Sequence, residues 1–214
     1  MRTLLISCET LRGEIELLEK RNRLEMDAVW LEPGLHDTPD KLHVLLQKHL
    51  KSISDYDRVI LGMGRCGGAL NQLKTGNYEM ILPKADDCIS VFFGSDKLRY
   101  AYGNENASIF LTEGWALGER SFAAEFRSYI EDYDEETALY LLEMMYGNFR
   151  TLTYIDTGAY DVQKLMAETC VAAKRCKLCP KVVPVNLSLL EQTLAGPWDE
   201  SLFYVVPPHG TLQF

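Results

Sequence analysis

Short apolar runs that alternate with helical segments are the feature that most constrains the fold of this chain. Five runs in the first half have the β-rich composition of buried strands: 3–7, 27–31, 58–63, 78–83 and 107–112. Strands that are apolar throughout and separated by helices are typical of a parallel sheet covered on both faces. We therefore predict an α/β fold, with a doubly wound, mainly parallel sheet and helices on both faces.

The segments between these runs carry helical signals. Residues 11–20 place Leu11, Ile15 and Leu18 on one helical face. Thr38 suits an N-cap and Pro39 suits the first position of a helix that runs to about Ser52. A further helix is predicted over 69–74, ending at Gly76.

The second half also alternates strands with helices, but it begins with a long helical stretch. A helical stretch over 121–146 is predicted to bend near Asp132 to Asp134, and a final strand over 202–206 precedes two prolines. Two strand and helix units lie between them, 151–156 with 162–174 and 181–185 with 188–194. We divide the chain into a core α/β domain, residues 1–120, and a second part, residues 121–214, which either completes the sheet or forms a companion lobe.

Composition and charge exclude some classes of partner. The 214 residues are 47% hydrophobic and 25% charged, which is ordinary for a globular protein, and the net charge is -9. A nucleic-acid partner is not expected, because binding to phosphates requires a concentrated basic surface. The first apolar run is far too short for a signal sequence or a membrane span of roughly 20 residues, so we expect a cytoplasmic protein with no membrane partner.

Three of the six cysteines follow predicted strands. Cys8 follows the first strand, Cys66 lies in the glycine-rich turn after the third, and Cys88 comes a few residues after the fourth. In an open parallel sheet, ligands bind outside the carboxyl ends of the strands. We expect these thiols, with His36 from the loop after the second strand, to converge at one edge if the first, third and fourth strands are neighbours.

Thiolates and an imidazole are ligands for soft metals. Cys8, Cys66, Cys88 and His36 would form a tetrahedral zinc site or anchor an iron-sulfur cluster, and three ligands with one open position would suit catalysis. Two other interpretations stay open. Free cysteines are often small buried apolar residues. Alternatively one of these thiols is a redox or nucleophilic group. Cys66 is the first candidate, because a helix N-terminus favours the thiolate.

Other residues near the same predicted edge could contact a ligand. The glycines of the turn 64–68 could let its backbone cradle an anion, although they could equally serve only a tight turn. A carboxylate at a strand end could orient a histidine or act as a base, and the simpler role for each is an N-cap or a solvated loop. The candidate ligand-binding residues are Gly64, Arg65, Gly67, Asp86, Asp87, Glu113 and Trp115.

A second group of cysteines lies near residue 175. Cys176 and Cys179 form a C-x-x-C pair, and Cys170 precedes them inside a predicted helix. A fourth ligand is not near in the sequence, so an independent metal site here is the weaker hypothesis.

Several motifs taken together resemble the family known as domain of unknown function 1638. They occur in order over about the first 120 residues, as Leu35-His36-Asp37, Gly62-x-Gly64-x-Cys66-Gly67, Ala85-Asp86-Asp87-Cys88, Phe93-Gly94-Ser95 and Leu111-Thr112-x-Gly114-Trp115. Many members of the family have a histidine before the Asp-Cys pair, and here Asp86 takes its place. This puts any role of that histidine in doubt for this chain.

The resemblance implies a biological setting. The family is prokaryotic, abundant in anaerobes and methanogens, and often encoded beside corrinoid-dependent methyltransferases. The resemblance therefore implies a role in one-carbon or corrinoid metabolism, with a corrinoid protein or a methyltransferase as partner. We expect a metal-thiolate protein that binds or activates a small thiol or a methylated compound. The alternative is an accessory protein without enzymatic activity that binds a small molecule or a corrinoid.

Overall fold

The computed structural model describes residues 2–116, 118 and 121–214, and it has the predicted α/β fold. By their contacts, the residues fall into two compact units. The first combines residues up to 98 with residues 186–214, and the second consists of residues 99–185. This division differs from the boundary at residue 120 predicted from the sequence. Each unit is described by itself.

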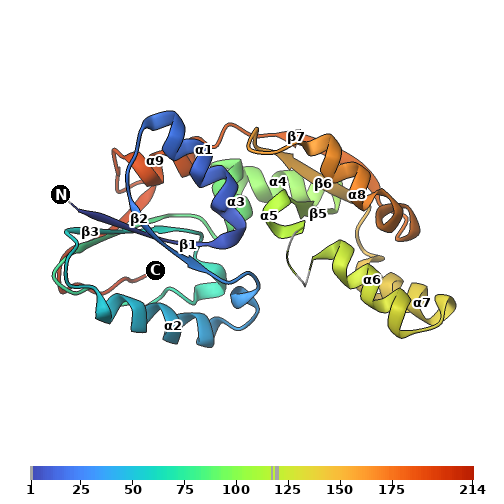
Figure 1. Ribbon diagram of the computed structural model, residues 1–214, viewed down its shortest axis with the longest axis horizontal. Helices are drawn as coiled ribbons and strands as arrows, with labels where there is room; N and C mark the ends of the chain where they lie inside the picture. Colours follow the sequence, from blue (N-terminus) through green and yellow to red (C-terminus); the bar gives the residue numbers. More distant parts are fainter. Residues whose placement is uncertain (1, 117, 119–120) are drawn as a thin grey trace. The chain divides into compact units, whose positions relative to one another are not determined.

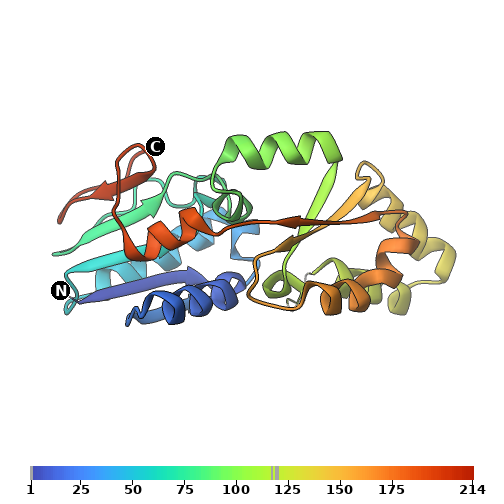
Figure 2. The ribbon, with the colours of Figure 1, turned by 90° about the horizontal axis from the view of Figure 1, so that it is seen from above.

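The first unit is built on a five-stranded sheet with the order β2-β1-β3-β4-β8. Its strands are β1 (Thr3–Cys8), β2 (Asp27–Leu31), β3 (Arg58–Gly62), β4 (Glu79–Pro83) and β8 (Phe203–Val206). The first four are parallel, and β8 pairs antiparallel with β4 at the edge (Figure 2). The predicted adjacency of the first, third and fourth strands is therefore confirmed.

Helices cover both faces of this sheet. Figure 1 shows α1 (Arg12–Asn22) and α9 (Ser188–Ala195) on one face and α2 (Pro39–Ser52) on the other. The short helix α3 (Cys88–Phe93) packs against α9. Helix α2 buries Leu42, Leu46 and Leu50, because these positions recur on one helical face.

The loops after β1, β2 and β3 each contain a single 3-10 turn. These are η1 (Glu9–Leu11), η2 (Leu35–Asp37) and η3 (Cys66–Gly68). The helix predicted over 69–74 is wrong, because residues 69–72 form turns and Lys74 forms an isolated bridge with Thr211. Gln72 has a φ of 64°, which interrupts any helix at this point.

The second unit contains a separate three-stranded parallel sheet in the order β5-β6-β7. Its strands are β5 (Ser108–Leu111), β6 (Thr151–Asp156) and β7 (Cys179–Pro184). The fifth predicted strand thus forms, but it does not join the first sheet.

Helices surround the smaller sheet. They are α5 (Glu113–Ala116), α6 (Phe122–Asp132), α7 (Glu135–Tyr146) and α8 (Val162–Arg175), and α4 (Asp96–Asn106) spans the boundary of the two units. The predicted bend near Asp132 to Asp134 is confirmed, because α6 ends there and the Asp134 side chain caps α7. Leu142, Leu152 and Leu165 lie in the core of this unit. Among the described residues, none of the helices has the length and apolar character needed to span a membrane.

Candidate thiol site

Three free thiols lie at or just after the carboxyl ends of neighbouring parallel strands in the first unit. Cys8 is the last residue of β1, Cys66 begins η3 after β3, and Cys88 begins α3 after β4. Cys88 is buried, whereas Cys8 and Cys66 are half-buried. This edge of a parallel sheet is where ligands bind in open α/β folds.

The loops after β3 and β4 are joined by their backbones. The backbone N–H of Arg65 donates to the carbonyl of Ala85 at 2.8 Å, and that of Cys66 donates to Asp86 at 3.0 Å. Gly64 allows the contact, since a Cβ at this position would lie only 2.5 Å from the carbonyl carbon of Asp87. The glycine is therefore required for the close approach of two backbones.

The backbone around Cys66 adopts an uncommon conformation. Cys66 has a φ of 47°, and Gly67 and Gly68 have φ values of 66° and 85°. Such a conformation costs little for glycine but is unfavourable for a side chain with a Cβ. The backbone bonds between the two loops hold Cys66 in place.

The side chains of Cys66 and Cys88 interact with each other. The interaction with Cys66 and burial together raise the pKa of Cys88 well above the usual range. Cys88 therefore keeps its proton near neutral pH.

Cys8 lies near this pair. Burial raises its pKa, and the nearby Cys88 side chain raises it further. The hydroxyl of Thr10 donates to the Cys8 sulfur at 3.0 Å and acts in the opposite direction, because it stabilises the thiolate. The structure thus places both Cys66 and Cys8 within electrostatic reach of Cys88.

The fit of a metal ion to these side chains is partial. Sulfur donors suit soft metals, and the loops that carry Cys66 and Cys88 lie against each other. Within the described residues, however, no group of three His, Cys, Asp or Glu side chains is arranged to hold an ion. A metal bound by all three thiols would require at least one side chain to turn.

Two carboxylates form ion pairs with Arg65. Its guanidinium forms ion pairs with Asp86 and with Asp96, the latter at 3.5 Å, and Asp96 also accepts from the backbone N–H of Asp86 at 2.7 Å. These acidic partners leave the cation poorly suited to receive an anion. Arg65 instead fastens the start of α4 to the two loops.

Asp87 and His36 also contact neighbouring groups of the protein. The Asp87 carboxylate caps α3 and accepts from the backbone N–H of Ser90 at 2.7 Å. The Nε2 atom of His36 lies 3.3 Å from Oδ1 of Asp37, and the histidine side chain is 55% exposed. The structure thus places His36 on the surface, paired with its neighbour.

The remaining predicted residues are distributed over both units. A Cβ on Gly67 would lie 3.6 Å from Pro39, so this turn packs against the start of α2. Glu113 and Trp115 lie in α5 of the second unit, where Trp115 packs against the core. The expectation that they follow a strand of the first sheet is wrong, because β5 belongs to the other sheet.

The second cysteine group also lies in the second unit. Cys170 is in α8, Cys176 is the C-cap of that helix, and the exposed Cys179 begins β7. Burial raises the pKa of Cys176 to about 11.

Two residues of the site were not predicted from the sequence. Thr10 binds the sulfur of Cys8, and Asp96 binds Arg65 and the loop before α3. The Gly94-Ser95-Asp96 segment carries a signal that could have located Asp96, since glycine ends one helix and serine often begins the next.

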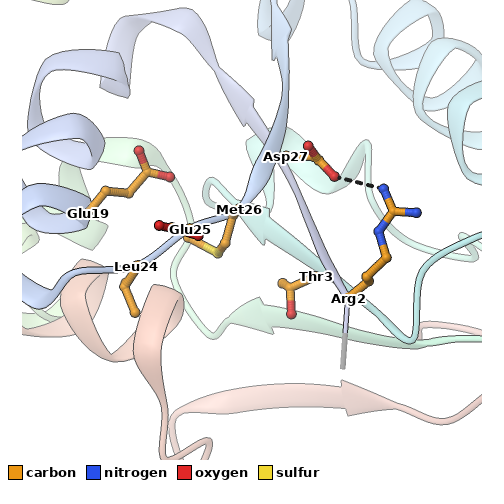
Figure 3. Close-up of a pocket in the computed structure, with 7 residues that line it drawn as sticks. All are labelled: Arg2, Thr3, Glu19, Leu24, Glu25, Met26 and Asp27. Atoms are coloured by element: carbon orange, nitrogen blue, oxygen red, sulfur yellow. Dashed lines mark hydrogen bonds and ion pairs between the residues drawn. The ribbon is translucent and has the colours of Figure 1, made fainter.

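A hollow of about 480 Å³ lies at the opposite edge of the first sheet, near the amino ends of β1 and β2 (Figure 3). The Arg2 guanidinium pairs there with Asp27 at 3.1 Å, as the dashed line shows. Parallel strands place their amino ends away from the thiols, so this hollow is not part of the thiol site. Its lining residues are Arg2, Thr3, Glu19, Leu24, Glu25, Met26 and Asp27.

Fold and site together define an α/β protein with clustered thiols at the carboxyl edge of a parallel sheet. Residues 30–194 match the family described as "Protein of unknown function (DUF1638)", and the chain belongs to this family. The matched region includes Cys66 and Cys88 and extends well beyond residue 120, where the resemblance seen in the sequence motifs ends. No curated protein and no solved structure matches the chain.

Proposed function

We propose that the first unit binds a thiophilic metal ion through Cys66 and Cys88, with Cys8 as the third ligand. A remaining coordination position would take a small thiol or a methylated compound. The observation that carries this proposal is the pair of backbone hydrogen bonds that joins the loops of Cys66 and Cys88 at the sheet edge, with Cys8 within electrostatic reach.

The joined loops of Cys66 and Cys88 support a shared ligand. A tetrahedral zinc ion with bonds of about 2.3 Å separates two sulfur ligands by roughly 3.8 Å. The two side chains already interact, so rotation of the side chains could bring both sulfurs to one ion. Cys8 would have to exchange the hydrogen bond from Thr10 for a bond to the metal.

Zinc is the ion whose chemistry best matches the proposed substrate class. A bound zinc ion keeps a coordinated sulfur deprotonated near neutral pH, and a zinc-bound thiolate is a good methyl acceptor. An iron-sulfur cluster remains the second choice. The link to corrinoid methyl transfer, and to a corrinoid protein or methyltransferase as partner, depends on the family resemblance alone.

Metal content after anaerobic purification tests the proposal. The wild-type chain, prepared without chelator, is expected to contain one zinc ion or one iron-sulfur cluster per chain by elemental analysis. Cys66→Ser and Cys88→Ser should lose the metal, because each removes one of two paired ligands. Cys179→Ser is the matched control, since this exposed thiol lies in the other unit and should leave the metal content unchanged.

Cobalt provides an independent readout. Co²⁺ added to the anaerobic metal-free chain should give thiolate charge-transfer absorption in wild type and in Cys179→Ser but not in Cys66→Ser. Wild-type protein that contains no stoichiometric metal and gives no such absorption would contradict the proposal.

A further inference from the structure

The Cys66 and Cys88 pair can also react without a metal. We propose that these residues form a dithiol site for thiol–disulfide exchange with small-molecule disulfides, in which a disulfide between Cys66 and Cys88 is the oxidised product. This proposal goes beyond metal binding and does not depend on it.

The backbone holds the two thiols together. Two backbone hydrogen bonds, from Arg65 to Ala85 and from Cys66 to Asp86, join the loops that carry the two cysteines. The missing side chain of Gly64 lets one loop rest on the backbone of Asp87, the residue that precedes Cys88. Two cysteines fixed in this way have a high effective concentration toward each other.

The different exposures of the two thiols set an order of reaction. Cys66 is half-buried and can meet a small disulfide, whereas Cys88 is buried and can reach only its neighbours. Cys66 is therefore the attacking thiol, and Cys88 resolves the mixed disulfide.

The chemical steps balance without another oxidant. The Cys66 thiolate attacks a disulfide RSSR, which breaks the S–S bond, forms a mixed disulfide and releases RS⁻, which takes up the proton lost by Cys66. The Cys88 thiol then loses its proton and attacks the Cys66 sulfur, which releases a second RS⁻ that takes up this proton. Two protein thiols are oxidised, and one small disulfide is reduced to two thiols.

Cys8 is the other nearby thiol that could form a disulfide with Cys66. Its sulfur is held by the hydroxyl of Thr10, whereas the loops that carry Cys66 and Cys88 are joined by backbone hydrogen bonds. We therefore expect the disulfide to join Cys66 to Cys88 and to leave Cys8 reduced.

Peptide mapping can identify the pairing directly. Metal-free, fully reduced chain is incubated with oxidised glutathione under anaerobic conditions, the remaining thiols are alkylated, and the chain is digested with trypsin. The three thiols fall in separate peptides, residues 3–12, 66–74 and 85–97. The expected product is the 66–74 peptide linked to the 85–97 peptide, with the 3–12 peptide alkylated.

Single serine variants test the order of the steps. Cys88→Ser should accumulate a mixed disulfide of glutathione with Cys66, because the resolving thiol is absent. Cys66→Ser should lose the linked peptide and gain little glutathione at the buried Cys88. Cys179→Ser is the matched control, because this exposed thiol lies in the other unit, and it should form the linked peptide as wild type does. Circular dichroism checks that each variant is folded.

Two outcomes would overturn this inference. One is a wild-type chain whose Cys66 stays as a stable mixed disulfide with glutathione, and the other is a linked peptide that contains Cys8. Because the chain is free of metal throughout, a failure here is separate from a failure of the metal-content experiment.

Discussion

Gly64 is the residue at which the geometry of the thiol site is most sensitive to substitution. A Cβ there would lie 2.5 to 2.7 Å from three backbone atoms of Asp87, and a backbone contact cannot be relieved by a change of rotamer. We predict that Gly64→Ala lowers the free energy of unfolding by about 1–3 kcal/mol, as overpacking does elsewhere. Urea denaturation measures this change.

Gly13 provides the matched control. It lies in α1, and a Cβ at this position would have no atom within 4 Å. Gly13→Ala should therefore stabilise the chain by up to about 1 kcal/mol, through helix propensity alone. Equal effects of the two substitutions would contradict the close contact between the loops.

Cys176 has a pH dependence that can be measured. Its pKa is raised to about 11 by burial, so the thiol remains protonated at pH values where a free cysteine is ionised. We predict that its rate of alkylation by iodoacetamide in the folded chain still increases between pH 9 and about 11. Mass spectrometry of the peptide with Cys176 measures the rate.

The unfolded chain is the reference for that experiment. In urea the rate should level off above a pKa of about 8.5, as for an ordinary cysteine. A plateau at the same pH in the folded chain would contradict the effect of burial.

At the scale of single elements, the start of α3 depends on Asp87. Its carboxylate accepts from the backbone N–H of Ser90 and satisfies one of the free donors at the helix start. We predict that Asp87→Ala lowers the free energy of unfolding by about 1 kcal/mol, whereas Asp87→Asn costs less because the amide oxygen can still cap. Thermal or urea denaturation of both variants measures the difference.

The two variants also separate a capping role from ligand binding. If Asp87 serves only as a cap, Asp87→Asn should retain the metal content of wild type. A loss of metal in Asp87→Asn, with stability preserved, would show instead that the charge of this carboxylate matters to the site.

The elements of the first sheet were predictable from local pattern. Strands β1 and β3 are continuous apolar runs, and Pro39 after Thr38 marks the start of α2. The convergence of strand ends followed from the topology of parallel sheets. The turns after Cys66 were not predictable in this way, because residues in the left-handed region, such as Gln72, give no pattern of period 3.6.

A local sequence pattern cannot predict which distant side chains pair or which sheet a strand joins. The ion pairs of Arg65 with Asp86 and Asp96 join residues up to 31 positions apart, which only the folded chain brings together. The apolar run of β5 predicts a strand but does not say which sheet the strand enters. For this reason the sequence placed Glu113 at the wrong sheet.

At the scale of the whole molecule, the first unit is assembled from two distant parts of the chain. Residues 186–214 return to it after the second unit and supply β8 at the edge of the sheet and α9 against β3, β4 and α1. A contact between distant segments closes a long loop, so the stability of β1 to β4 should depend on residues far along the sequence.

Leu190 tests this dependence. It lies in α9 and is 0% exposed, and truncation of a buried leucine to alanine costs about 2–5 kcal/mol. We predict that Leu190→Ala increases amide hydrogen exchange in β1, β3 and β4, more than 100 residues earlier in the chain.

Leu152→Ala is the matched control, because Leu152 is equally buried but lies in β6 of the second unit. It should increase exchange first in β5, β6 and β7. If Leu190→Ala loosened the second sheet and left β1, β3 and β4 protected, residues 186–214 would not stabilise the unit that carries the thiols.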